Sequence, residues 1–173
     1  MQKKVLIFGC GELQRSIILR AKKMGLYTVG IDPCENATCK DDVDAFEVVG
    51  GQDFEGTCAV VEKYGIDAIV TAATDKPLVM MARIAEKYGF PFYSVETAQW
   101  STDKFQMKHQ FELGDVPHAR GVLLRASDIS HLPFAVSNQK EPTASCQKLI
   151  ANGQELHFPV IVKPRDNSGS RAV

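Results

Sequence analysis

Short apolar runs alternate with amphipathic segments at a nearly regular spacing through residues 1–95. The amphipathic segments carry apolar side chains at helical spacing and end at glycines, which are common helix stop signals. This alternation is typical of a doubly wound, mainly parallel α/β sheet, a Rossmann-like fold. Right-handed crossovers favour the strand order 3-2-1-4-5. The five runs that we expect to form strands are 4–8, 27–31, 45–49, 66–73 and 90–94.

The pattern changes after residue 95, where we place a domain boundary in the range 95–100. The chain is therefore predicted to contain a Rossmann-like domain over 1–95 and part of a second domain over 96–173. A helix is expected over 101–117, because Ser101 or Thr102 can cap it and Asp103 suits its first turn. The elements expected after it are a strand over 118–126, an irregular stretch over 127–143, a helix over 144–153 and a strand over 157–164.

Composition excludes several functional classes. The net charge is -1, so nothing points to a nucleic-acid partner or an anionic membrane surface. No apolar run approaches the roughly 18 residues that a membrane span requires. The five cysteines form no CxxC pair, which argues against a metal centre or a disulfide framework and favours a reduced, cytoplasmic setting. Pairing of Cys34 with Cys39 across a short loop stays open.

The first predicted strand leads into the motif GCGELQ, residues 9–14. Gly9 and Gly11 permit a tight turn that brings backbone N–H groups near an anion at a helix N-terminus. A dinucleotide fingerprint would place a third glycine where Gln14 stands, while Asp32 occupies the position of the ribose-binding acid. This motif is compatible with a dinucleotide site, a site for another small ligand or a purely structural turn.

Ligands of open α/β sheets gather at the carboxyl ends of the strands. The motif TAATDKP, residues 71–77, follows the fourth predicted strand. Thr74 and Asp75 are therefore candidate ligand contacts. Either side chain could instead only cap the following helix.

The motif VIVKPRDNSGSR, residues 160–171, has the composition of a phosphate site. Lys163 follows a β-branched run, and the loop after it offers backbone N–H groups, hydroxyls and a guanidinium for phosphate oxygens. Lys104 lies in the first turn of its predicted helix, where a cation opposes the helix dipole unless an anion is bound nearby. The loop residues concerned are Asn167, Ser168, Gly169, Ser170 and Arg171.

Taken in this order, the segments resemble an ATP-grasp enzyme over the whole chain. Residues 1–95 resemble the pre-ATP-grasp domain, and STDKFQMK resembles the helix that follows it in the superfamily. FPVIVKPRDNSGSRAV resembles the strand and the glycine-rich flap that close over the nucleotide phosphates. GCGELQ resembles the first turn of the formate-dependent purine transformylase branch, and TAATDKP resembles the turn after the fourth strand of carbamoyl-phosphate-synthase-like members.

The resemblance implies a role for each matching residue. Lys104 would reach the phosphates of ATP, and Lys163 would contact the α-phosphate and the adenine side. The flap over the β- and γ-phosphates would consist of Ser168, Gly169, Ser170 and Arg171. Contacts to the second substrate would come from Gly11, Glu12 and Thr74, with Asp75 beside them.

The resemblance also implies a reaction. An ATP-dependent carboxylate–amine ligase forms an acyl phosphate, which an amine then attacks, so small carboxylates and amines are the expected substrates. Mg²⁺ ligands are expected in a C-terminal half that lies beyond Val173. The chain would then be the N-terminal portion of a ligase, inactive without that lobe or a second chain, and a homodimer is compatible with it.

Three departures from the family pattern stand out: Gln14, Ala172 in the flap, and a long stretch over 127–157. Two alternatives stay open. One is an NAD(P)-binding oxidoreductase or regulatory dinucleotide-binding module that uses Gly9, Gly11 and Asp32. The other is a non-catalytic binding or assembly subunit of a split ligase.

Overall fold

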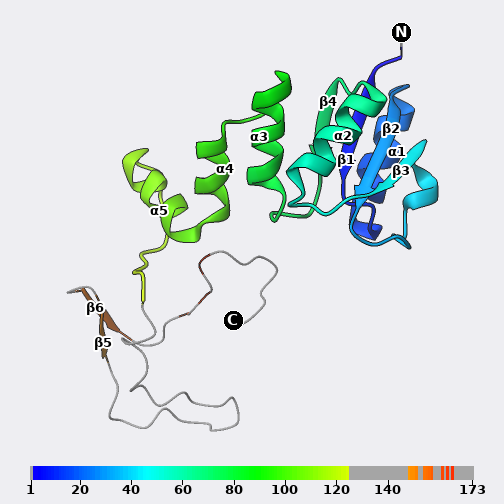
Figure 1. Cartoon of the computed structure of the whole chain (residues 1–173). Helices are drawn as coiled ribbons and strands as arrows, with labels where there is room; N and C mark the ends of the chain where they lie inside the picture. Colours follow the sequence, from blue (N-terminus) through cyan, green and yellow to red (C-terminus); the bar gives the residue numbers. More distant parts are fainter. Residues whose placement is uncertain are drawn as a thin grey trace, which may run out of the picture. The chain divides into compact units, whose positions relative to one another are not determined.

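A computed structural model describes residues 2–124, 148–151 and 154–157, together with Ile161, Lys163 and Arg165. The chain divides into two compact units, Met1–Thr102 and Asp103–Val173, which are described separately below. Figure 1 shows the elements of both units along the chain. The division falls shortly after the predicted range of 95–100.

The first unit is built on a sheet of four parallel strands in the order β3-β2-β1-β4. The predicted α/β fold is thus confirmed, as is the order of its first four strands. β1 lies inside the sheet, and its last four residues are buried. The strands are β1 (Lys4–Phe8), β2 (Tyr27–Asp32), β3 (Ala45–Val48) and β4 (Ala68–Thr71).

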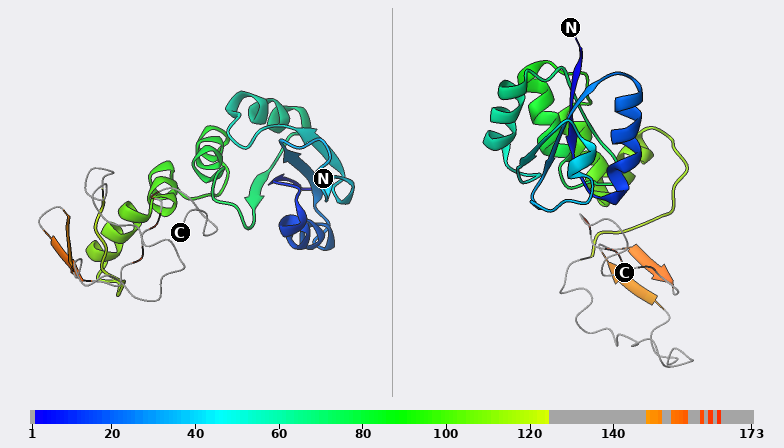
Figure 2. Two further views of the ribbon diagram at one scale, coloured as in Figure 1. Left: turned by 90° about the horizontal axis from the view of Figure 1, so that it is seen from below. Right: turned by 90° about the vertical axis from the view of Figure 1, so that its right-hand side faces the viewer.

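Helices cover both faces of this sheet (Figure 2). Alternate residues of β1 point to opposite faces, as the strand period requires. Leu6 and Phe8 belong to the larger core cluster, which includes buried residues of α2 and α3. Val5 and Ile7 pack with Ile18 of α1 on the other face. The helices of this unit are α1 (Arg15–Lys23), α2 (Phe54–Tyr64), α3 (Leu78–Tyr88) and α4 (Val95–Thr102), with short 3₁₀ turns η1 (Glu12–Gln14) and η2 (Lys40–Asp42).

The predicted fifth strand over 90–94 does not form. Pro91 has no N–H to donate to a sheet, and a short apolar run alone does not distinguish a strand from a packed loop. Phe90 and Phe92 pack against the larger core cluster instead, and the ring of Phe92 stacks on Tyr93 at 4.1 Å between centroids. The segment fills the core without extending the sheet.

Helix α4, which the sequence did not lead us to expect, begins directly after this segment. The hydroxyl of Ser94 accepts a hydrogen bond from the N–H of Thr97 at 3.1 Å, which satisfies one of the free donors of the first turn. Ala98 is fully buried.

The second unit contains α5 (Lys104–Leu113) and an antiparallel pair, β5 (Lys148–Ala151) and β6 (Gln154–His157). The predicted helix over 144–153 is wrong, because 148–151 is a strand. The sequence Asn-Gly between two strands is the strongest short signal for a hairpin turn, but its glycine also matches a helix stop. No strand is present over 118–124, and the expected irregular stretch over 127–143 lies outside the described residues.

Two further predictions concern cysteines and membranes. Cys34 and Cys39 are both free thiols, so the pairing that was left open is not formed. Cys146 lies outside the described residues. Among the helices that the structure describes, none combines the length and the apolar character needed to cross a bilayer.

Candidate functional site

The loop after β1 is tied to the loop after β4 at the carboxyl edge of the sheet. Gly9 adopts a φ of 90°, which favours glycine, and its N–H donates to the carbonyl of Ile31 at 2.8 Å. The buried side chain of Gln14 donates from Nε2 to the carbonyl of Ala72 at 2.5 Å. A Cβ on Gly9 would lie 3.2 Å from Cδ of Gln14, so this side chain fills the space above the turn.

The carboxylate of Asp32 accepts hydrogen bonds from the loop after β1 and from the loop after β2. Its Oδ2 accepts a hydrogen bond from the N–H of Cys10 at 2.9 Å, and its Oδ1 accepts one from the N–H of Cys34 at 2.8 Å. In a dinucleotide site this acid would face a ribose, and the space that Gln14 occupies would be open to the pyrophosphate. Both observations argue against the dinucleotide alternative.

Glu12 lies next to this turn and is engaged by a guanidinium. Both carboxylate oxygens of Glu12 accept from Arg15, at 3.0 and 2.9 Å, and Arg15 also donates to Oδ2 of Asp42 at 2.7 Å. The hydrogen bonds from Arg15 lower the pKa of the exposed Glu12 carboxyl. The carbonyl of Gly11 accepts from the N–H of Gln14 at 3.0 Å. The turn therefore presents an ionised carboxylate at the surface.

Thr74 and Asp75 follow Ala73, whose φ of 55° is unusual for a residue with a side chain. Thr74 is half-buried and Asp75 is exposed. The alternative that they cap α3 is wrong, because Pro77 is the N-cap residue and no side chain caps that end. The bond from Gln14 to Ala72 places this loop beside the Gly11 turn.

Tyr93 is a candidate contact that sequence reasoning missed. Burial and the charge of Asp75 both raise the pKa of its phenol, which places Tyr93 near that carboxylate. The residue is partly exposed and stacks on Phe92. The available signal was the position of 90–94 after α3, because in a parallel sheet the segment that follows a crossover helix runs back toward the carboxyl edge.

In the second unit, the chain around Arg165 meets the N-terminus of α5. The N–H of Lys104 donates to the carbonyl of Arg165 at 3.0 Å, and Nε of Arg165 donates to Oδ2 of Asp103 at 2.5 Å. Lys163, two residues earlier, is exposed. The two segments that carry the candidate phosphate-binding lysines thus touch through their main chains. Ser168, Gly169, Ser170 and Arg171 lie outside the described residues.

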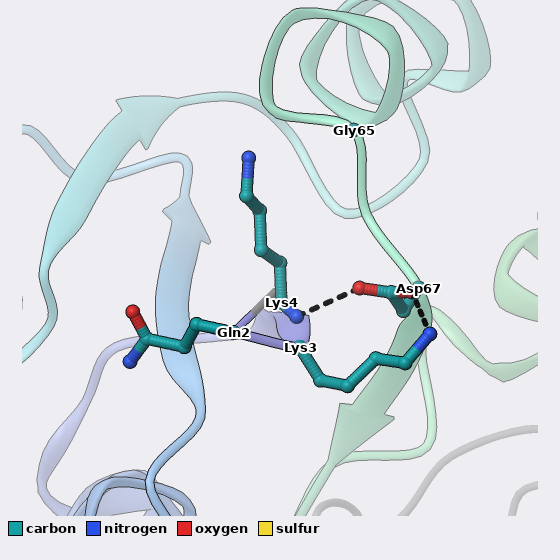
Figure 3. A pocket seen from close by; sticks show the side chains of 5 residues that line it. All are labelled: Gln2, Lys3, Lys4, Gly65 and Asp67. Carbon is teal, nitrogen blue, oxygen red and sulfur yellow. Dashed lines mark hydrogen bonds and ion pairs between the residues drawn. The ribbon is translucent and has the colours of Figure 1, made fainter.

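A separate pocket of about 460 Å³ lies at the opposite edge of the sheet, where β1 begins (Figure 3). Asp67 accepts from Nζ of Lys3 at 2.6 Å and from the N–H of Lys4 at 2.9 Å. The bond from Lys3 is the main cause that lowers the pKa of Asp67. Nζ of Lys4 donates to the carbonyl of Tyr64 at 2.6 Å. The polar groups of this pocket are thus hydrogen-bonded to one another or to the main chain. Ligands of parallel sheets bind at the other edge, so we do not assign the site here.

The chain is similar to several curated proteins along nearly its whole length. A formate-dependent phosphoribosylglycinamide formyltransferase from Prochlorococcus marinus (strain MIT 9515) is 33% identical over 177 residues, which cover 99% of this chain and 39% of the relative. Its counterpart from Bacillus velezensis is 25% identical, over 98% of this chain and 39% of the relative. The chain therefore spans about two-fifths of the length of these relatives. No protein-family model matches it.

The chain is also similar to solved structures of other enzymes. A phosphoribosylglycinamide synthetase from Anaerococcus prevotii superposes with a TM-score of 0.62 at 26% identity, over 75% of this chain and 34% of that one. An N5-carboxyaminoimidazole ribonucleotide synthetase from Thermotoga maritima also gives 0.62 at 26% identity, over 77% and 37%. The fold, the motifs and these similarities agree, and the chain belongs to the ATP-grasp superfamily, of which it represents the N-terminal region.

Proposed function

We propose that the chain is the N-terminal portion of an ATP-dependent ligase that joins a small carboxylate to an amine or a similar nucleophile. The observation that carries the proposal is the junction of α5 with the segment around Arg165. This junction brings together the two segments with candidate phosphate-binding lysines, although they are about 60 residues apart in the sequence.

The charges at this junction suit a polyphosphate. Lys104, Lys163 and Arg165 are cationic, and Asp103 forms an ion pair with Arg165. α5 is 10 residues long, and the positive end of its dipole lies at this junction. Bound ATP would supply the phosphoryl group that activates the carboxylate, and Lys104 and Lys163 would hold its phosphates and offset their charge. Ser168–Arg171 would cover the phosphates as a flap.

The second substrate is proposed to bind at the carboxyl edge of the first unit. Gly11, Glu12, Thr74 and Asp75 lie on the two loops that Gln14 joins. An ionised Glu12 and an exposed Asp75 suit a ligand with hydroxyl or amine donors. The curated relatives named above act on phosphoribosylglycinamide by their names, and this similarity supports an amine of that kind as the proposed second substrate.

We infer that these 173 residues alone do not catalyse the reaction. The chain spans only 39% of its curated relatives, and no cluster that could hold a metal ion occurs within the residues described. The Mg²⁺ ligands are proposed to lie in a C-terminal lobe, either on a continuation of this chain or on a second chain. We expect this chain to bind nucleotide weakly and to show no turnover.

A titration with two nucleotides tests this function. ATP·Mg should perturb the NMR resonances of the α5 N-terminus and of Lys163, whereas NADH should perturb neither these nor the Gly9–Gln14 turn. Inorganic triphosphate serves as the control that separates phosphate binding from adenine binding. Perturbation of the Gly9–Gln14 turn and of Asp32 by NADH, with no effect of ATP, would replace this proposal with the dinucleotide alternative.

A further inference from the structure

Asp103 serves two elements of the second unit at the same time. Its Oδ1 accepts hydrogen bonds from the N–H groups of Phe105 and Gln106, both at 3.0 Å, and so caps α5. Its other oxygen, Oδ2, accepts from Nε of Arg165 at 2.5 Å. Burial alone would raise the pKa of this carboxyl, but the hydrogen bonds that it accepts outweigh burial and lower it. Asp103 is therefore a charged acceptor shared by a helix end and a distant segment.

The main chain makes the second half of the same junction. The N–H of Lys104 has no partner within a regular helix, since it belongs to the first turn. Here it donates to the carbonyl of Arg165 at 3.0 Å. Arg165 is thus attached to α5 by its side chain and by its main chain. Two contacts fix the direction of the segment as well as its position.

This attachment limits the position of Lys163. Two residues of fully extended chain span at most about 7 Å, so the Cα atom of Lys163 lies within that distance of Arg165. From there, the flexible four-carbon stem of lysine is long enough to reach the first turn of α5. A break in the junction would leave Lys163 free to move away from Lys104.

We propose that Asp103 and Arg165 form a positioning pair, which holds Lys163 beside Lys104 so that both ammonium groups meet one polyphosphate ligand. The inference rests on the proposed function and deepens it. It also assigns Arg165 a role that differs from that of a phosphate ligand. Its guanidinium is turned to Asp103, and the phosphate contacts are left to the two lysines.

Asp103→Ser is the discriminating variant. Serine preserves the N-cap but removes the partner of Arg165. Removal of a negative charge near a bound triphosphate would by itself strengthen ATP binding, because it removes a Coulomb repulsion. A positioning pair predicts the opposite result, because Lys163 is released: affinity for ATP·Mg should fall about fivefold, which corresponds to the upper range for a partly exposed ion pair.

The exchange rate of the Lys104 amide gives a second readout that needs no nucleotide. Asp103→Ser and Arg165→Met should each accelerate this exchange about fivefold, because the Arg165 carbonyl leaves the amide. In the double variant the Lys104 amide should exchange no faster than in either single variant, since both substitutions remove the same pair. Arg165→Lys keeps a charge that can face Asp103. Its Lys104 exchange rate and its affinity for ATP·Mg should therefore lie between those of Arg165→Met and of the unmodified chain.

The outcomes separate the two proposals. An unchanged Lys104 exchange rate together with unchanged or tighter ATP binding in Asp103→Ser would overturn the positioning pair. Accelerated Lys104 exchange in a chain whose unmodified form binds no ATP·Mg would overturn the proposed function and leave the junction as a structural contact. Accelerated exchange with weaker ATP binding supports both.

Discussion

Replacement of Lys163 by alanine is expected to weaken ATP·Mg binding more than tenfold. A hydrogen bond between charged groups contributes about 1.5–3 kcal/mol, and about 1.4 kcal/mol corresponds to a factor of ten in affinity. Lys163 is exposed and lies two residues from the contact with α5, so its ammonium group is available to a ligand at that end of the helix. Lys104→Ala should have an effect of similar size.

The comparison variant for this experiment is Lys23→Ala. Lys23 is an exposed lysine in the last turn of α1, in the other unit, and its removal changes the net charge by the same amount. Its affinity for ATP·Mg, measured by NMR titration, should stay within twofold of the unmodified chain. Equal affinities of Lys163→Ala and Lys23→Ala would contradict the assignment of Lys163.

Gly30→Ala should destabilise the first unit by about 1–3 kcal/mol, since it overpacks a buried position. Gly30 pairs with Ile7 across β2 and β1. A Cβ added there would lie 2.4 Å from Sγ of Cys10 and 3.2 Å from both methyl groups of Val43. Cys10 is fully buried, so its side chain has little freedom to move away. Urea denaturation measures the loss in the free energy of unfolding.

Cys10→Ala should rescue part of this loss, because it removes the atom nearest to the new methyl group. The double variant is then more stable than the sum of the single effects predicts, and the difference measures the contact. Gly50→Ala is the matched control: its nearest contact would be Cβ of Asp53 at 3.9 Å, an ordinary van der Waals distance. An equal effect of Gly30→Ala and Gly50→Ala would contradict the packing of β2 against the loop after β1.

Sequence patterns predicted the first unit better than the second. β1 and β2 carry buried runs that include β-branched residues, and glycines follow α1, α2 and α3 at or near their ends. The error at 90–94 arose because Phe90 and Phe92 pack in the core as strand residues would, and periodicity in five residues does not separate the two cases. The error at 144–153 arose because a glycine in a sequence can indicate either the end of a helix or a hairpin turn.

The candidate site was predictable only in part. The motifs around Lys104 and Lys163 indicated phosphate chemistry, but no sequence pattern links Asp103 to Arg165, which are 62 residues apart. The double role of Gln14, which fills the first turn and holds the loop after β4, likewise depends on the sheet order β1-β4. Contacts of this kind are set by tertiary packing.

Acetylation of lysines with and without ATP·Mg tests most directly whether Lys104 and Lys163 bind the same ligand. Limited reaction with acetic anhydride, followed by mass spectrometry, reports the reactivity of each ammonium group. We predict that ATP·Mg protects Lys104 and Lys163 together, with the same dependence on its concentration, while the reactivity of Lys23 stays constant. Protection of only one of the two lysines, or of neither at saturating ATP·Mg, would contradict a shared nucleotide site.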